Sequence, residues 1–405
     1  MILLHKHLIG IAVGSAFAST CAFAEESTSI AEALSAGKTN LHLRLRYEDV
    51  TDSALDDASA LTIKTRLSFV SGTYEGFGLA VEMDDTTAIT DVDYRDGAGT
   101  GTPNEVVIAD PEVTEVNQAY LSYHNWQSDF KWGRQRIILD NQRFVGGVGW
   151  RQDEQTFDGF SVNSNPAEGL ALHASYITQV NRIFAETQDH NHETILLNAK
   201  YDTAFGAIIG YGYLIENKTV QALTSDTVGA RWQGKAGKYI TYNLEYANQS
   251  ADDQTDIDPA AIEYSADYML AEVTGDIPVA KTAINVMAGY EVLGSDEGAK
   301  AFTTSLATLH AFQGWTDKFL NTPNTGIKDM YVSVGTTISS IKLGLIYHTM
   351  EADFGDITYG DEIDFVASSK VGPVALTLKY ADFTADDDFA SSDTSKLWLM
   401  AAMSF

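Results

Sequence analysis

The feature that most constrains this chain is a period-two alternation of apolar and polar residues that recurs from residue 40 to the C-terminus. In 41–47 every odd position is apolar and every even position is polar, and the same period recurs in segments such as 240–247 and 341–348. Successive side chains of a strand point to opposite faces, so each segment has one apolar and one polar face. A helical period fits none of these segments, and the pattern predicts an all-β fold.

Eighteen such segments are predicted. They span 40–48, 60–71, 76–84, 116–124, 129–136, 154–162, 170–180, 193–201, 205–215, 225–233, 238–247, 263–273, 281–292, 328–336, 341–350, 362–370, 374–383 and 395–405. Long and short connections alternate strictly between them, and all seven prolines fall outside them. This alternation is typical of an up-and-down antiparallel barrel with long extracellular loops and short periplasmic turns.

The strand length favours a barrel that crosses a membrane. Segments of about 9–11 residues span a bilayer when tilted. Tyr and Trp recur at strand ends, as at Tyr47, Trp132 and Tyr201, which fits aromatic girdles at the two interfaces. A soluble β-sandwich or propeller is the alternative, but shorter strands and no systematic difference between the two rims would be expected of it. We therefore predict a transmembrane β-barrel.

The N-terminus predicts export. Lys6, an apolar stretch from residue 8 to 18 and the sequence Ala22-Phe-Ala24 form a secretory signal peptide over 1–24. A lipoprotein modified at Cys21 is the weaker alternative. Residues 25–39 are predicted to form a short periplasmic helix or tether, with a capping box at Ser29 and Glu32, and residues 40–405 the barrel. The chain contains one cysteine, so no disulfide is expected.

The net charge of the chain and the positions of its acidic residues exclude some classes of function. The formal net charge of −30 argues against a nucleic-acid partner. The acidic excess lies in predicted outer loops, in the runs 52–57, 91–96, 252–258 and 386–388. None of them has the central Gly and terminal Glu of an ordered calcium loop, so solvated loops are predicted, with no metal site and no cofactor.

Basic residues concentrate early in the chain, on the polar face of the first two predicted strands. Arg44 and Arg46 lie on the first strand and Lys64 and Arg66 on the second. Adjacent strands place them about 5 Å apart, a ladder that attracts anions. The alternative is a neutral network in which carboxylates such as Glu48 and Glu82 brace the wall against the same cations. The sequence leaves both open.

Four further arginines are candidates for the pore lining. Strict alternation sends Arg134 and Arg136 outward with Trp132, so either a bulge near Gly133 turns them inward or they meet lipopolysaccharide at the rim. Arg143 and Arg151 flank a Gly-rich stretch that can fold into the lumen. A second stretch, 306–320, is too apolar for a solvated loop, and we predict that it packs inside or over the barrel mouth.

The last predicted strand ends the chain on Phe405. A terminal aromatic residue that closes an alternating strand resembles the C-terminal signal of Gram-negative outer-membrane proteins. That resemblance implies recognition by the barrel assembly machinery and a place among outer-membrane lipid and lipopolysaccharide.

Three stretches together resemble outer-membrane porins of the alginate-export family. They are 31–38 leading into 43–48, 133–146 with 149–158, and 306–320. The resemblance implies a monomeric 18-stranded barrel, and the best-known member passes an anionic polysaccharide through an arginine-rich lumen. The strongly acidic balance of this chain departs from that member.

These observations predict an outer-membrane porin for passive diffusion of small anionic or sugar-like solutes. The alternative is an exporter of an anionic polysaccharide such as alginate. A barrel enzyme or a surface-binding protein is less favoured, because the sequence has no Gly-x-Ser-x-Gly elbow, no phosphate loop and no convincing catalytic triad.

Overall fold

The computed structural model of the protein describes residues 26–89, 94–279 and 282–405. The predicted signal peptide, 1–24, lies outside the described residues.

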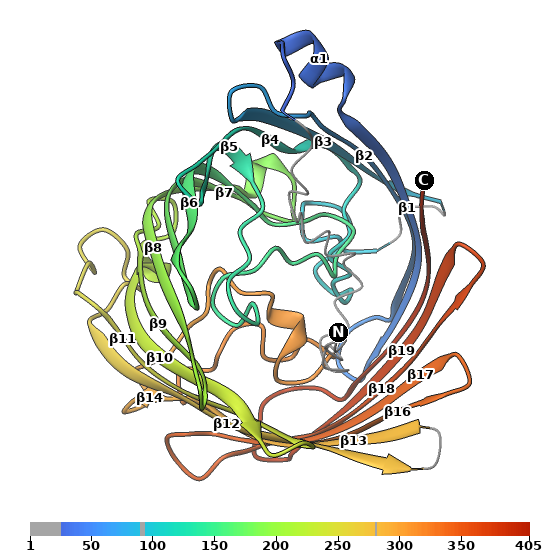
Figure 1. Ribbon diagram of the computed structural model, residues 1–405. Coiled ribbons are helices and arrows are strands. Elements are labelled where there is room, and N and C mark those ends of the chain that lie inside the picture. The colour runs from blue at the N-terminus through green and yellow to red at the C-terminus, as the bar shows by residue number, and fades with distance from the viewer. Residues whose placement is uncertain (1–25, 90–93, 280–281) are drawn as a thin grey trace.

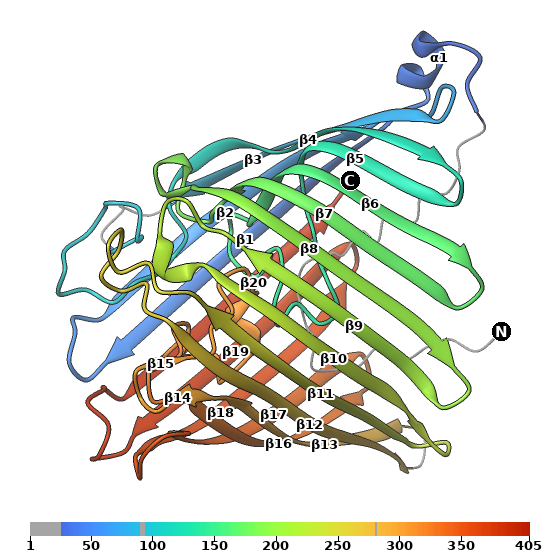
Figure 2. The same cartoon turned by 90° about the vertical axis from the view of Figure 1, so that its left-hand side faces the viewer.

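Eighteen strands form one closed antiparallel sheet in which each strand pairs with the next and β1 also pairs with β20. The strands are β1 (Lys38–Asp52), β2 (Ala58–Val70), β3 (Phe77–Ala88), β4 (Val113–Asn125), β5 (Ser128–Gln135), β6 (Thr156–Ala167), β7 (Leu170–Asn181), β8 (His190–Thr203), β9 (Gly206–Ile215), β10 (Ser225–Ala236), β11 (Ile240–Ala251), β12 (Tyr264–Val279), β13 (Thr282–Leu293), β16 (Ile327–Ile338), β17 (Ile341–Glu351), β18 (Thr358–Val371), β19 (Val374–Ala385) and β20 (Thr394–Ser404). The predicted up-and-down barrel of 18 strands is confirmed, and Figures 1 and 2 show the ring of strands and their tilt.

The ring closes where the two ends of the chain meet. Leu43 of β1 lies opposite Met403 of β20 on one side and opposite Thr65 of β2 on the other. The backbone of Phe405 continues the pairing, since its amide donates to the carbonyl of Leu41 at 2.9 Å. Closure leaves no strand edge unpaired in the membrane, which lipid could not solvate.

Long and short connections alternate around the barrel except at its start, where the predicted long connection, 53–57, is no longer than the predicted short one, 71–76. The longest are 89–112, 136–155 and 294–326, whereas the opposite rim has turns such as 126–127 and 204–205. We refer to these as the long-loop end and the short-turn end. Two small elements, β14 (Ser295–Asp296) and β15 (Lys300–Ala301), form a hairpin within 294–326. Single turns of 3₁₀ helix occur at η1 (Glu186–Gln188), η2 (Gln221–Leu223) and η3 (Leu309–Ala311).

The expectation that every proline lies outside the strands is wrong at two positions. Pro166 lies in β6 and Pro278 in β12, each near the short-turn end of its strand. The β6–β7 register shifts between Ser164 and Ala167, which accommodates the missing amide of Pro166.

The outer surface of the barrel is apolar. Leu67, Phe77, Leu121 and Trp132 are among its exposed side chains, and Trp132 is 69% exposed. The inner face carries the polar partners of the alternation, as the burial pattern of β1 illustrates. In the described ranges, no helix is long and apolar enough to span a bilayer.

A short helix, α1 (Ile30–Ser35), precedes β1 at the short-turn end (Figure 2). Ser29 is its N-cap as predicted, and its hydroxyl accepts from the amide of Glu32 at 3.2 Å. The carboxylate of Glu32 reaches the amide of Thr28 at 2.7 Å rather than that of Ser29. The helix ends at Ser35 with Ala36 as its C-cap, and Gly37 follows directly.

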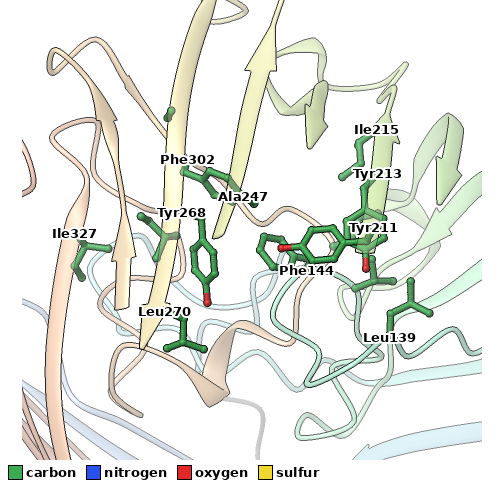
Figure 3. Close-up of a cluster of buried hydrophobic side chains, with 14 of the residues drawn as sticks. Leu139, Phe144, Tyr211, Tyr213, Ile215, Ala247, Tyr268, Leu270, Phe302 and Ile327 are labelled. Carbon is green, nitrogen blue, oxygen red and sulfur yellow. The ribbon is translucent and has the colours of Figure 1, made fainter. Parts of the chain in front are cut away.

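Two long loops, 136–155 and 294–326, fold into the ring of strands (Figure 1). They share a buried apolar cluster with the wall, in which Phe144 of the first loop contacts the rings of Tyr211, Tyr268 and Phe302, with centroid distances of 5.3, 5.1 and 5.8 Å. Figure 3 shows these side chains converging from β9, β12 and both loops. Leu306 and Phe319 also belong to the cluster, so the stretch 306–320 packs inside the barrel, as predicted.

Candidate functional site

The charged interior of the barrel is organised by one segment of the first inward loop, residues 150–154, which we call the wall-crossing segment. It runs across the inner faces of the first strands, and its backbone carbonyls accept from wall arginines. Arg46 donates to the carbonyl of Trp150 at 2.7 Å, and Arg44 donates to the carbonyl of Arg151. The side-chain amide of Gln152 donates to the hydroxyl of Thr62 on β2 at 2.9 Å.

The last residue of the wall-crossing segment, Glu154, neutralises a second group of cations. Its carboxylate contacts Arg66 of β2 at 2.8 Å and Arg136 at 2.7 Å, and Lys64 lies 3.9 Å away. Asp84 of β3 binds the same wall cations, at 2.7 Å from the ammonium of Lys64 and 2.6 Å from Arg66. The wall cations are therefore held between a strand carboxylate and a loop carboxylate.

Asp153 makes a contact of a different kind. Its side chain is buried, as is that of Glu115 on β4, and the two carboxyl groups are close enough to interact electrostatically. Burial, and then the neighbouring Glu115, raise the pKa of Asp153 well above its usual value, because both disfavour a second negative charge there. Asp153 thus lies near both a group of its own charge, Glu115, and a cation, Lys64.

A third charged group joins the two inward loops to β20 and β1. Arg151 contacts Glu48 at 2.9 Å and Asp317 of the second loop at 3.0 Å. Asp317 also accepts from Lys396 of β20 at 2.8 Å. Arg46 lies 3.1 Å from Glu48, so the two predicted wall residues are part of the same network.

Beside this network a lysine lies in an aromatic cage. The ammonium of Lys379, on β19, is 4.0 Å from the ring centroid of Trp150 and 3.6 Å from that of Trp315. It donates to His310 at 2.8 Å. One tryptophan comes from each inward loop, so the cation–π contacts attach both loops to the wall.

At Arg143 the loop supplies the cation and the wall supplies the carboxylate, which is the reverse of the arrangement at Glu154. Arg143 contacts Glu291 of β13 at 2.7 Å and lies over the ring of Phe312 at 4.6 Å. Its other nitrogens donate to Thr304 and Gln313, both on the second inward loop. Arg143 therefore ties the two loops together as well as to the wall.

Arg134 and Arg136 point to opposite sides of the sheet at the end of β5. The register with β4 is unbroken through Gly133, so Arg134 stays on the face of Trp132 and pairs with Asp158 of β6 at 2.9 Å. The assignment of Arg134 to the pore lining is therefore wrong, because the alternation that directs it outward is not interrupted by a bulge. Arg136 lies just beyond the last residue of β5 and turns inward to Glu82 and Glu154.

The structure places nine of the ten predicted pore residues in the interior and pairs each of their cations with a carboxylate or backbone oxygen. These residues are Arg44, Arg46, Lys64, Arg66, Glu48, Glu82, Arg136, Arg143 and Arg151. Arg66 and Arg136 retain the most exposed side chains among these cations, at 14% and 25%. The interior therefore contains the neutral network of paired charges that was one of the two alternatives from the sequence. Its exposed cationic surface is confined to Arg66 and Arg136.

Several members of the network were missed from the sequence. Lys379 and Lys396 lie on the polar faces of predicted strands, so the alternation alone identifies them as inward residues. Asp317 and Asp110, which lies 3.4 Å from Arg46, are on loops and carry no periodic signal. In the described part of the chain no group of three or more His, Cys, Asp or Glu residues is arranged to hold a metal ion.

The fold and interior define a class: a transmembrane β-barrel of 18 strands whose polar lumen is partly filled by two inward loops. Residues 38–291 match the family model described as alginate export. The chain belongs to this alginate export family.

Solved structures with the same fold come from Pseudomonas aeruginosa. The chain is similar to OpdK, crystallised with vanillate, at a TM-score of 0.70 and 15% identity over 92% of this chain and 99% of that one. It is also similar to OccD3 (OpdP), at a TM-score of 0.67 and 16% identity over 92% of each chain. OccK8 (OprE) matches at 0.68 and 14% identity over 92% and 99%. No curated protein sequence matches the chain.

Proposed function

We propose that the protein is an outer-membrane channel for passive diffusion of small anionic or sugar-like solutes. The observation that carries this proposal is the pair Arg66 and Arg136, whose guanidinium groups are partly exposed beside the inward loops. Fixed guanidinium groups raise the local concentration of anions and bind carboxylates in a bidentate way. Polar side chains along the inner face supply hydrogen-bonding partners for sugars. The fold shared with OpdK, a structure obtained with vanillate, agrees with this proposal.

The proposal includes the route of the chain to the membrane. Residues 1–24 are the signal peptide and are cleaved, and 25–39 form the periplasmic tether, which puts the short-turn end in the periplasm. Phe405, whose side chain is 65% exposed, is the residue that the barrel assembly machinery reads. Arg134, on the outer face, is placed to meet lipopolysaccharide phosphates. The barrel functions as a monomer and has no enzymatic activity.

An exporter of an anionic polysaccharide is the second candidate, and family membership favours it. The arrangement of the interior favours small solutes instead. Both inward loops occupy the ring of strands, and an exposed basic stripe from rim to rim is replaced by paired charges. A polymer would need the loops displaced from the apolar cluster around Phe144.

Planar-bilayer recording of the purified barrel tests the proposal. We expect a steady conductance with an anion preference that decreases in Arg66→Gln and Arg136→Gln. Liposome-swelling rates then separate the two candidates: monomeric uronates and sugars should enter, and oligouronates long enough to fill the lumen should not. A barrel without conductance in its folded form would contradict both candidates.

A further inference from the structure

The long-loop end of the barrel is strongly acidic. The loop segments 56–57, 252–258 and 386–388 contain nine aspartates and no lysine or arginine. Seven of these aspartates have exposed side chains. Fixed charges of one sign around a mouth raise the local concentration of the opposite ion. This mouth therefore attracts cations and repels anions.

The mouth at the other end, where Figure 2 shows the short turns, has lysines on its inner side. Among the described strands, six lysines point inward from within the four residues nearest this end: Lys38, Lys131, Lys200, Lys235, Lys342 and Lys370. Alternation along each strand fixes their direction. Lys131 precedes Trp132 and Lys370 precedes Val371, and both of these apolar neighbours are exposed on the lipid face. Lysines at strand ends can extend to lipid headgroups, but these side chains start from the lumen face instead.

Five of these six lysines have no ion-pair partner among the described residues. The exception is Lys200, which lies 3.0 Å from Asp202. Lys131 lies over the ring of Tyr120 at 4.6 Å, and the residues opposite it on both neighbouring strands are serines. The inward carboxylates at the same strand ends are Asp129, Asp202 and Asp276, so positive charge is in excess there. The five lysines differ in this respect from the cations beside the wall-crossing segment, which carboxylates or backbone oxygens hold.

We propose that Lys38, Lys131, Lys235, Lys342 and Lys370 form an anion-capturing rim at the short-turn mouth, and that this lysine rim and the acidic loops together make the channel rectify. The inference rests on the proposed function, because it requires an open channel. When the short-turn side is negative, anions enter through the lysine rim and cations enter through the acidic loops, so both ions accumulate in the lumen. At the opposite voltage each ion enters through a mouth of its own sign, and the current is smaller.

Single-channel current–voltage curves of the full barrel test the proposal. In about 0.1 M KCl the currents at about 100 mV of either sign should differ by about 1.5-fold or more, with the larger current when the short-turn side is negative. In about 1 M KCl, where the Debye length falls from about 10 Å to about 3 Å, the two currents should become nearly equal. The orientation of each channel is assigned with Ser391→Cys, an exposed loop position, by the compartment from which biotin maleimide and then streptavidin alter the current.

The lysines are tested by a triple variant, Lys235→Gln/Lys342→Gln/Lys370→Gln. All three side chains are exposed and unpaired, so the barrel should fold normally by heat-dependent gel mobility. The ratio of the two currents should fall close to one. Lys218→Gln, the same substitution in a loop at the long-loop end, is the control and should not lower the ratio.

Three results would overturn the proposal. One is a wild-type channel that conducts with an anion preference and equal currents at both voltages, which would leave the proposed function standing and contradict the lysine rim alone. A second is an unchanged current ratio in the triple variant, which would assign the asymmetry to the shape of the inward loops. The third is a larger current when the short-turn side is positive. A folded barrel without conductance would contradict the proposed function and this inference with it.

Discussion

Lys396 of β20 donates to the carboxylate of Asp317 at 2.8 Å, and both side chains are buried. Asp317 is the one carboxylate that this lysine contacts among the described residues. The pair joins the last strand to a loop that begins about a hundred residues earlier in the chain, and Arg151 extends it to the other inward loop at 3.0 Å. Opposite charges also meet at Glu154, which contacts Arg66 of the wall, and at Arg143, which contacts Glu291 of the wall.

Removing Asp317 should release the second inward loop from the wall. Asp317→Ala leaves Lys396 without its partner, and breaking a buried ion pair from one side costs about 3–5 kcal/mol. We expect a lower urea midpoint, measured by heat-dependent gel mobility. The double variant Asp317→Ala/Lys396→Met should recover part of the loss, because no uncompensated ammonium remains. Equal destabilisation of the single and double variants would show that the two residues are not coupled.

Acidification should destabilise the same loop through His310. Its Nδ1–H donates to Asp317 at 2.7 Å and its Nε2 accepts from Lys379 at 2.8 Å, an arrangement that requires neutral imidazole. Burial, and then the ammonium of Lys379, hold the pKa of His310 well below its usual value. The unfolded chain therefore binds this proton more readily than the folded barrel.

The sign of the pH effect follows from that difference. The contribution of neutral His310 is fully present above the unfolded pKa of about 6.5 and decreases at lower pH by about 1.4 kcal/mol per pH unit. Unfolding free energies at pH 7.5 and 5.5 should differ more in wild type than in His310→Gln. An identical pH dependence in the two proteins would show that His310 does not contribute.

Two substitutions should change ion selectivity in opposite directions. Glu154→Gln removes the carboxylate shared by Arg66 and Arg136 and should raise the chloride-to-potassium permeability ratio by about threefold, whereas Arg136→Gln should lower it by a similar factor. Reversal potentials in a KCl gradient measure both. Asp387→Asn is the control for a charge removed from an outer loop. Shifts of the same sign in Glu154→Gln and Arg136→Gln would contradict the placement of this pair beside the ion path.

Gly133 should resist substitution, because it allows β5 to approach β4 closely. Its φ is +125°, and a Cβ built there would lie 2.3 Å from the carbonyl oxygen of Ala119. Gly133→Ala should destabilise the barrel by more than about 2 kcal/mol, through backbone strain and loss of pairing. Gly210→Ala is the matched control, since its Cβ would meet nothing within 4 Å. Gel mobility after graded heating compares the two, and equal stability would contradict the strain argument.

The strands were predictable from the sequence because a membrane barrel repeats one local rule. Each strand must present an apolar face to lipid and a polar face to the lumen. The strand at 41–47 can therefore be predicted without reference to any other segment. The same rule correctly directed Arg44, Arg46, Lys64 and Arg66 inward. It also directed Arg134 outward, and the inclusion of that residue in the pore lining was wrong because it set the rule aside.

What the tertiary structure alone decided is the electrostatic character of the lumen. The partners of the wall cations, Glu154 and Asp317, lie on loops without periodicity, and their positions depend on the apolar cluster that Phe144 and Phe319 form with strands far away in the chain. A local pattern contains no information about such contacts. The sequence by itself therefore determined the barrel and the direction of each strand side chain. Long-range packing decided that most basic residues support the wall and that few remain exposed to a solute.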